Sequence, residues 1–319
     1  MTTAVSRRIQ PAHPPTPGKP DLRLVPAEPR ERAQPFLKWV GGKSKLLGQL
    51  SELMPHGPLR YAEPFVGGGA VFFWLWSQRR LDTALLCDLS PDVIAACEAV
   101  RNRPGELLQA LDLHERAYLR CDEEGRAAYF YAVRERHPAD HPVDDVARAA
   151  RMLFLNRTCF NGLWRENSRG RFNSPHGRYP DPKIVQEDKV RAASEALKDA
   201  EILRADFRAL PELVAQRGLD FVYLDPPYHP VSVTSSFNAY SGGTFSARSQ
   251  AELADTCRQL DAMNVRFLLS NSDCPLIRDL YRGFRIDTVQ APRSVNSRGS
   301  GRGDVGEVAI SNRRPGLAW

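Results

Sequence analysis

The sequence predicts an α/β protein in which a Rossmann-like, mostly parallel sheet carries an inserted, mainly helical domain. Two observations lead to this fold class. Short apolar runs typical of buried strands alternate with helical segments along most of the chain, and one central stretch breaks that alternation. With 319 residues, of which 42% are hydrophobic, the chain can form one large domain with an insertion or two modest domains, and a wholly disordered chain is excluded.

The expected elements of the sheet follow in chain order. A strand at 59–65 leads through a glycine turn into a helix over 71–78. A second strand at 84–88 leads into a helix that begins near Pro91, where a missing N–H costs little. Other apolar runs bounded by turn residues predict the remaining buried elements: strands at 201–205, 219–224 and 265–270, and a helix over 247–263. Strands that alternate with helices favour a parallel sheet covered on both faces.

Residues 104–179 interrupt this alternation. Their first half is helical and charged, whereas residues 156–179 are rich in Arg, Asn, Gly and aromatic residues and have no clean apolar stripe. We interpret this second part as too polar for a core and expect it at the surface. The predicted domains are a disordered Pro-rich arm (1–34), a sheet domain formed by 35–103 and 186–319, and an inserted domain at 104–185.

The composition is basic, with a formal charge of +6, a pI of about 9.1 and 37 arginines among the 44 basic residues. This surplus suits a polyanionic partner, although a GC-rich genome also enriches arginine. No run of about 18 apolar residues is present, so we expect no membrane span. The six cysteines form no C-x-x-C pair, so we expect free thiols in a cytoplasmic protein without a metal site.

Three glycines, Gly67, Gly68 and Gly69, follow the first expected strand and precede a helix. Glycines at such a turn let the backbone approach a ligand, and the helix N-terminus adds positive potential. The full dinucleotide fingerprint is not met, because Phe72 occupies the position of its third glycine. Asp88, at the end of the next strand, is placed either to bond the ribose of a nucleotide-like cofactor or to cap the following helix.

Gly41-Gly42-Lys43-Ser44 is similar to the end of a phosphate-binding loop. The complete motif requires a glycine five positions before Gly42, where this chain has Leu37. The sequence therefore excludes a P-loop ATPase.

Asp225-Pro226-Pro227-Tyr228 stands at the carboxyl end of an apolar strand, the edge at which α/β sheets bind ligands. The prolines fix the backbone and lack N–H groups, which leaves carbonyl oxygens as acceptors. A carboxylate and a carbonyl can accept the two hydrogens of a planar amino group while an aromatic ring stacks on the same molecule. The alternative is a proline turn with a capping aspartate.

Three motifs in this order resemble those of the Dam-like DNA adenine-N6 methyltransferases. They are Phe-Leu-Lys-Trp-Val-Gly-Gly-Lys at 36–43, Glu-Pro-Phe-Val-Gly-Gly-Gly at 63–69 and Asp-Pro-Pro-Tyr at 225–228. The resemblance extends from about residue 36 to residue 312. It includes residues 161–179, which are similar to the target-reading hairpin of that family, and also Phe237, Tyr240 and residues 270–273.

This resemblance implies an S-adenosylmethionine-dependent methyltransferase sheet with an inserted target-recognition domain that bears a β-hairpin. It also implies which residues contact S-adenosylmethionine or shape its pocket: Trp39, Lys43, Phe65, Gly67, Gly69, Asp88, Asp206, Phe207 and Asp225. An indole such as Trp39 attracts a sulfonium cation, and the ammonium group of Lys43 suits a carboxylate. A solvated surface lysine is the alternative for Lys43.

The resemblance implies double-stranded DNA as the partner, contacted by Lys38, Phe160, Asn161, Leu163, Arg165, Asn173, Pro175 and Tyr179. An arginine can bond a guanine edge, leucine and proline can contact a thymine methyl group, and an aromatic ring can fill the gap left by a flipped base. Dam-like enzymes read GATC with such residues, so GATC is the expected site. A purely structural basic hairpin is the alternative.

The implied reaction is methyl transfer to N6 of an adenine flipped out of the duplex. Asp225 and the Pro226 carbonyl would accept the two N6 hydrogens within the rigid turn that Pro227 completes, and Tyr228 would stack on the base. The alternatives are a methyltransferase of RNA or of a protein amide, and a catalytically silent DNA-binding regulator. We expect a monomeric, nucleoid-associated prokaryotic or phage protein, either orphan or paired with a restriction enzyme.

Overall fold

The computed structural model describes residues 32–39, 41–230, 245–290 and 306–314. Most of the expected arm lies outside this set, as do Phe237 and Tyr240, so what the sequence predicts for them stays a prediction. Ala33 is already buried in the core, and its carbonyl accepts a hydrogen bond from Ser77 Oγ at 3.5 Å. The packed domain therefore starts slightly before the expected boundary at residue 35.

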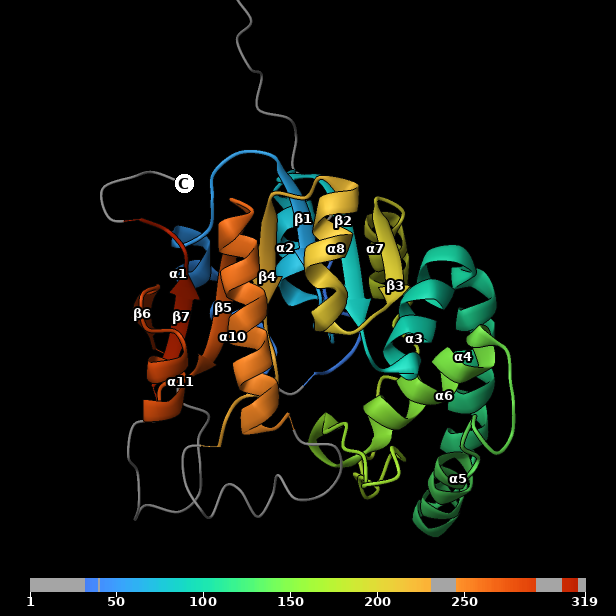
Figure 1. Ribbon diagram of the computed structural model, residues 1–319. Coiled ribbons are helices and arrows are strands. Elements are labelled where there is room, and N and C mark those ends of the chain that lie inside the picture. The colour runs from blue at the N-terminus through green and yellow to red at the C-terminus, as the bar shows by residue number, and fades with distance from the viewer. Residues whose placement is uncertain (1–31, 40, 231–244, 291–305, 315–319) are drawn as a thin grey trace, which may run out of the picture.

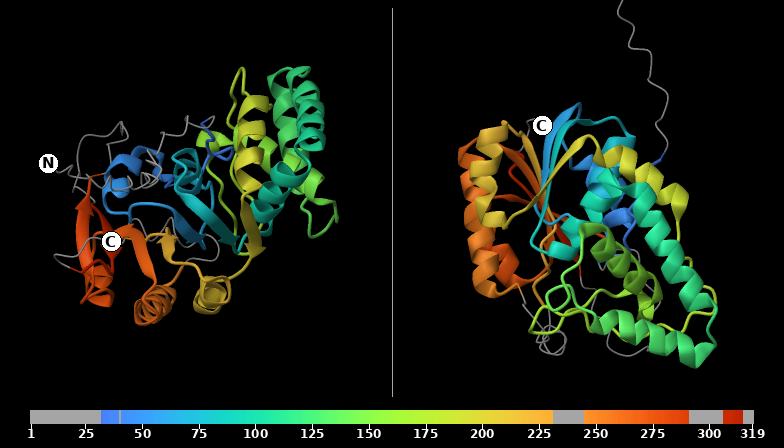
Figure 2. Two further views of the ribbon diagram at one scale, coloured as in Figure 1. Left: turned by 90° about the horizontal axis from the view of Figure 1, so that it is seen from above. Right: turned by 90° about the vertical axis from the view of Figure 1, so that its right-hand side faces the viewer.

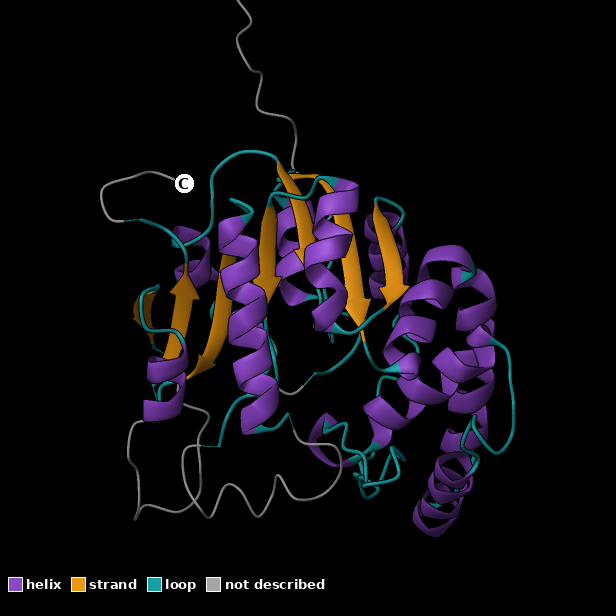
Figure 3. Cartoon of the chain, viewed as in Figure 1, coloured by secondary structure: helices purple, strands orange, loops and turns teal. Residues whose placement is uncertain are grey.

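A seven-stranded sheet with the order β3-β2-β1-β4-β5-β7-β6 forms the centre of the molecule (Figures 1 and 3). Its strands are β1 (Leu59–Glu63), β2 (Leu81–Asp88), β3 (Ala200–Arg204), β4 (Phe221–Leu224), β5 (Arg266–Ser272), β6 (Arg285–Val289) and β7 (Glu307–Ser311). Strands β1 to β5 pair in parallel, whereas β7 is antiparallel to both β5 and β6. The parallel strands therefore end at the edge of the sheet at which β7 begins.

Both faces of the central strands are buried, as the apolar strand sequences require. In β4, Phe221 and Tyr223 pack in one core and Val222 and Leu224 in the other. The first core also receives side chains from α1 (Leu47–Glu52), α2 (Ala70–Ser77), α3 (Pro91–Asn102) and α7 (Glu187–Leu197). The second receives them from α8 (Leu210–Arg217), α10 (Ala247–Ala262) and α11 (Pro275–Leu280). Figure 2 (left) shows α8 and α10 opposite α1 and α2.

Helices α3 and α10 begin with side-chain caps. Pro91 occupies the first turn of α3, and Ser90 Oγ accepts a hydrogen bond from Val93 N at 3.4 Å. Ser246 Oγ caps α10 by accepting from Ser249 N at 3.1 Å. Such caps satisfy backbone N–H groups that have no partner within the helix.

Helices α4 (Pro104–Leu119), α5 (Glu123–Glu135) and α6 (Asp145–Thr158) form the inserted region beside the sheet (Figure 1, right). Aromatic contacts fill its interior: the His114 ring stacks on Phe154 with centroids 4.9 Å apart, and the Tyr118 hydroxyl lies 2.7 Å from His176 Nε2. These buried side chains continue into the first core of the sheet without a break. The inserted helices are therefore packed firmly against the sheet domain.

Residues 156–179 correct one expectation and refine another. Residues 156–158 form the last turn of α6 and are buried, so the prediction that this stretch is too polar for a core is wrong there. After α6, the short helix η2 (Phe160–Gly162) begins an excursion that two isolated antiparallel bridges close, Cys159 with His176 and Glu166 with Phe172. The predicted β-hairpin is thus present in an irregular form; residues 159–179 are called the hairpin below.

The fold class is confirmed, and each expected strand and helix of the sheet domain is found with ends displaced by no more than three residues. Strands β6 and β7 are not predicted from the sequence. β6 lies at the sheet edge and is mostly half-exposed or exposed, so it lacks the apolar run that marks a buried strand.

Candidate active site

The predicted motifs meet at one edge of the sheet. The glycine turn follows β1, Asp88 ends β2, and Asp225 follows β4 directly. Because β1 pairs in parallel with both β2 and β4, all three strands deliver these residues to the same edge. In Figure 1 the hairpin lies on the side toward which these three strands point.

Lys43, Asp225 and Tyr228 form a compact cluster at this edge. Lys43 begins the short helix η1 (Lys43–Lys45), and its side chain is only 4% exposed. Its Nζ lies 2.7 Å from Asp225 Oδ1 and 4.8 Å from the centre of the Tyr228 ring, and it donates to the Gly41 carbonyl at 2.6 Å. The alternative of a solvated surface lysine is therefore wrong.

Opposing effects act on the pKa of the Asp225 carboxyl. Burial raises the pKa of Asp225 to about 6, the nearby Glu307 carboxylate adds to the rise, and Lys43 opposes it. The pair keeps one acidic and one basic group side by side in a nearly closed environment, where their interaction is stronger than in water.

The two proline carbonyls beside Asp225 have different surroundings. The Pro227 carbonyl accepts a hydrogen bond from Gln250 Nε2 at 3.0 Å. For the Pro226 carbonyl, the described part of the chain supplies no donor.

The glycine turn adopts the backbone shape that its sequence predicts. Gly67 and Gly69 have φ values of 44° and 67°, in the left-handed region that favours glycine. Asp88 Oδ2 accepts from Gly67 N at 3.0 Å, while its Oδ1 accepts from Ser90 N at 2.9 Å. Trp39 lies directly against this turn, because a Cβ at Gly67 would stand 2.5 Å from Trp39 Nε1. Asp88 therefore fastens the turn to the start of α3.

Three aromatic rings form one wall near the glycine turn. Phe65 and Phe207 have centroids 5.7 Å apart, and Phe245, from the residues before α10, lies 5.8 Å from Phe65 and 5.5 Å from Phe207. Asp206 caps the short helix η3 (Phe207–Ala209) and pairs with Arg208 at 2.8 Å. The structure thus brings Phe65 and Phe207 together and adds Phe245, which the sequence did not single out.

Glu63, which closes β1, is a buried carboxyl that the sequence predictions did not include. Its Oε2 accepts from Tyr61 Oη at 2.7 Å and from Phe72 N at 3.2 Å. Burial raises the pKa of Glu63 to about 8, with a further rise from Asp225. An apolar strand that ends in an acidic residue is the signal in the sequence that could have revealed it.

Apart from Lys38, the residues predicted to read DNA lie on the hairpin, and most of the set faces solvent. Lys38, Phe160, Asn161, Arg165, Asn173 and Pro175 are exposed, and Leu163 and Tyr179 are half-buried. Phe160 is 51% exposed, and Asn161 next to it has a φ of 56°, in the left-handed region. The Tyr179 hydroxyl accepts from Asn161 N at 2.7 Å, and Lys38 Nζ lies 5.7 Å from the Tyr179 ring.

The end of α6 ties the N-terminal segment to the hairpin. The buried Asn156 side chain accepts from Lys38 N and donates to the Lys38 carbonyl, both at 2.8 Å. Arg157 Nη2 donates to the Phe36 carbonyl at 2.6 Å. Lys38 is therefore clasped beside the hairpin, while the adjacent Trp39 packs on the glycine turn.

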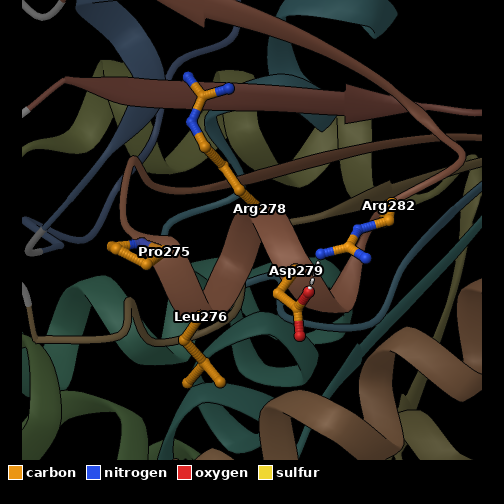
Figure 4. Close-up of a pocket in the computed structure, with 5 residues that line it drawn as sticks. All are labelled: Pro275, Leu276, Arg278, Asp279 and Arg282. Atoms are coloured by element: carbon orange, nitrogen blue, oxygen red, sulfur yellow. Dashed lines mark hydrogen bonds and ion pairs between the residues drawn. The ribbon is translucent and has the colours of Figure 1, made fainter.

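A shallow depression on α11 contains none of the predicted site residues (Figure 4). It is lined by Pro275, Leu276, Arg278, Asp279 and Arg282. Arg278 pairs with Asp273 and Arg282 with Asp279, so the guanidinium charges are already compensated. Elsewhere in the described chain, no helix is long and apolar enough to cross a membrane, and no three His, Cys, Asp or Glu side chains are grouped to bind a metal.

The strand order with one antiparallel strand, the glycine turn after β1 and Asp-Pro-Pro-Tyr after β4 together define a Rossmann-like methyltransferase fold. A family model described as D12 class N6 adenine-specific DNA methyltransferase matches residues 39–295. The chain belongs to this family, whose members are adenine-specific DNA methyltransferases.

Curated relatives agree with this assignment. The chain is 39% identical over 287 residues to the type II methyltransferase M.MjaIII of Methanocaldococcus jannaschii, a match that covers 88% of this chain and 99% of the relative. It is 38% identical over 284 residues to M1.LlaDCHI of Lactococcus lactis, covering 88% and 95%. It is 33% identical over 282 residues to the DNA adenine methylase of Escherichia coli K12, covering 88% and 96%. The similarity thus spans almost the whole length of these relatives.

Among solved structures, TrmN from Thermus thermophilus matches with a TM-score of 0.34 and 12% identity. The match covers 84% of this chain and 47% of that one. A likeness of this size adds nothing to the assignment.

Proposed function

We propose that this chain methylates N6 of an adenine rotated out of duplex DNA, with S-adenosylmethionine as the methyl donor. The observation that carries the proposal is the Lys43–Asp225–Tyr228 cluster beside the Pro226 carbonyl. It offers an acidic acceptor, a neutral acceptor and an aromatic ring at the ligand-binding edge of the sheet. The exposed Phe160 supports base extrusion, since an aromatic side chain can fill the gap in the stack.

The residues at the edge fit S-adenosylmethionine. The paired charges of Lys43 and Asp225 complement the carboxylate and ammonium groups of its amino acid part. Gly67 has no Cβ, which is what allows Trp39 to lie against the turn, where its indole face can meet a sulfonium. Asp88 stands beside the turn for the ribose, Gly69 shapes it, and Phe65, Phe207 and Asp206 offer an apolar wall with one polar group for an adenine.

In the proposed reaction Asp225 serves both the ammonium group of S-adenosylmethionine and the target base, whereas Pro226, Pro227 and Tyr228 have one task each. When bound, S-adenosylmethionine would supply an electrophilic methyl group. The bond between this methyl group and N6 would form as the sulfonium–methyl bond breaks, S-adenosylhomocysteine would leave, and the Asp225 carboxylate would take up the proton that N6 loses. The Asp225 carboxylate accepts one N6 hydrogen and the Pro226 carbonyl accepts the other, which directs the nitrogen lone pair away from the ring system. Pro227 fixes the turn, and Tyr228 stacks on the base. Orientation and local electrostatics then supply most of the rate enhancement.

We propose GATC as the recognition site. The hairpin residues have the chemistry for it, with the exposed Arg165 for a guanine edge and Leu163 and Pro175 for thymine methyl groups. The resemblance of the hairpin to that of Dam-like enzymes supports the same site. Action on chromosomal DNA would place the protein in the cytoplasm.

The test is expression in bacterial cells that lack adenine methylation, followed by mapping of modified adenines in their DNA. N6-methyladenine at GATC is the expected result, and Asp225→Ala should abolish it. Modification at a different sequence would overturn the site but not the chemistry. An active Asp225→Ala enzyme, or methyl transfer only to RNA or protein, would refute the proposed reaction.

A further inference from the structure

We propose that Glu307 and Gln250 are positioning residues that hold Tyr228 at both ends, so that its ring is oriented for stacking before a base arrives. This inference rests on the proposed function, because it concerns the ring assigned to the target adenine. Neither residue belongs to the motifs that point to the site. They come from β7 and α10, elements distant in the sequence from Tyr228.

The topology of the sheet explains how Glu307 reaches the site. β7 runs antiparallel to its neighbours, so its first residue lies at the edge where the parallel strands end. In the register of the sheet, Glu307 pairs with Ser272, the last residue of β5, and with Val289, the last residue of β6. Because β7 runs in the reverse direction, its first residue places the Glu307 carboxylate at the edge where the parallel strands have their carboxyl ends.

Glu307 holds the outer end of the Tyr228 side chain. The Tyr228 hydroxyl donates to Glu307 Oε2 at 2.8 Å. A hydrogen bond from a hydroxyl to a carboxylate is stronger than one between neutral groups. Because Tyr228 is half-buried and Lys43 Nζ faces its ring at 4.8 Å, this bond restricts how the ring can turn.

Gln250 and Asn271 hold the backbone on both sides of Tyr228. Gln250 Nε2 donates to the Pro227 carbonyl at 3.0 Å, and the N–H of His229 donates to Asn271 Oδ1 at 3.3 Å. The two amides are joined to each other, since Asn271 Nδ2 donates to Gln250 Oε1 at 3.0 Å. Ser272 Oγ completes the set by donating to the His229 carbonyl at 2.7 Å.

Burial makes this arrangement costly unless it is complete. Gln250 and Asn271 have no exposed surface, and buried amides destabilise a fold unless their polar atoms are bonded. Both polar atoms of each side chain have partners here. The backbone of 227–229 is therefore fixed from α10 and β5, and the hydroxyl of Tyr228 is fixed from β7.

The test compares Glu307→Ala with Glu307→Gln in single-turnover methylation of a duplex that contains the mapped target site. Glu307→Ala removes the acceptor, and we expect about a tenfold lower rate, as for loss of one positioning contact, with an unchanged dissociation constant for S-adenosylmethionine. Glu307→Gln keeps an oxygen that can accept from the phenol, so it should retain most of the rate at pH 8. Gln250→Met, which keeps the volume but not the bond, should behave like Glu307→Ala.

The matched control is Glu195→Gln, on the exposed surface of α7, where the rate should equal that of the wild type. Equal rates for Glu307→Ala and wild type would overturn the inference. An equal loss in Glu307→Ala and Glu307→Gln, in parallel with their loss of thermal stability, would also overturn it, since it would show a merely structural role. Absence of methylation by the wild-type chain would instead refute the proposed function.

Discussion

The ammonium group of Lys43 lies 2.7 Å from the carboxylate of Asp225, with only 4% and 20% of the two side chains exposed. Two residues that are far apart in the sequence thus form one charge pair at the carboxyl edge. Removing one partner of such a buried pair leaves the other uncompensated, which is far more costly than the pair itself is stabilising.

Lys43→Met should impair the enzyme most strongly at low pH. Lys43 lowers the pKa of Asp225, so its removal leaves this pKa above the present value of about 6 and protonates the acceptor at higher pH. We expect the acid limb of the kcat/KM profile to move up by about one pH unit or more. Lys198→Met, an exposed lysine of α7, is the matched control. An unshifted acid limb would contradict the role of the pair.

The acid limb should respond in the opposite direction to Glu307→Gln. Glu307 adds to the rise in the pKa of Asp225, so removing its charge lowers that pKa and extends activity to lower pH. In the wild type, kcat/KM should fall as the pH decreases through about 6. Beside burial, the groups that act on the pKa of Asp225 are Lys43, which lowers it, and Glu307, which raises it. A wild-type profile that stays flat to pH 5 would disprove this account.

Glu63→Gln should change how stability depends on pH. The pKa of Glu63 is raised from 4.5 to about 8, so between these values the folded state binds more protons at Glu63 than the unfolded chain does. The free energy of unfolding contributed by this group therefore falls as the pH rises through that range. In thermal unfolding from pH 5 to 9, the Tm of the variant relative to that of the wild type should rise by several degrees as the pH increases. A constant difference between the two proteins would refute the assignment.

Arg165→Ala should relax target choice more than it weakens overall binding. Its side chain is exposed on the hairpin, and a base-reading arginine contributes about 1–3 kcal/mol of discrimination. Methylation rates on duplexes with each base of the site replaced in turn provide the measurement. Arg169→Ala, also exposed on the hairpin, should lower the rates on all duplexes to a similar small extent. The base-contact role fails if both variants keep the wild-type ranking.

Asn156→Ala should weaken both folding and DNA binding. The substitution leaves the N–H and carbonyl of Lys38 without their 2.8 Å partners, and an unsatisfied buried polar group costs about 1–3 kcal/mol. Urea unfolding and duplex affinity measure the two effects. Asn102→Ala, at the exposed end of α3, serves as the control. Unchanged duplex affinity in Asn156→Ala would show that the two hydrogen bonds from Asn156 do not position Lys38 for DNA.

The sequence was most informative about local structure, that is, about strands and the turns that end them. Apolar strands ending in glycine or proline turns marked the edge of the sheet, and Gly67 and Gly69 adopt the backbone that this pattern predicts. The same reasoning missed β7, a short strand whose place between β5 and β6 depends on its pairing with both of them and is not evident from its own sequence. Glu307 was missed with it.

Contacts between distant segments were also beyond sequence reasoning. Asn156 and Arg157 look polar in a helical stretch, yet they are buried because their side chains replace water for the backbone of residues 36–38. Gln250 is a similar case: only the fold reveals that its amide reaches the Pro227 carbonyl.

The hydrogen bonds that hold Lys38 beside the hairpin have a consequence for protein engineering. One peptide bond separates a residue seated on the glycine turn from a residue anchored beside the hairpin. A chimera could take residues 159–179 from a relative with another target sequence. The side chains of that hairpin would then meet Lys38 in place of the residue that the relative has at this position. Such grafts should succeed only when the N-terminal segment is exchanged together with the hairpin.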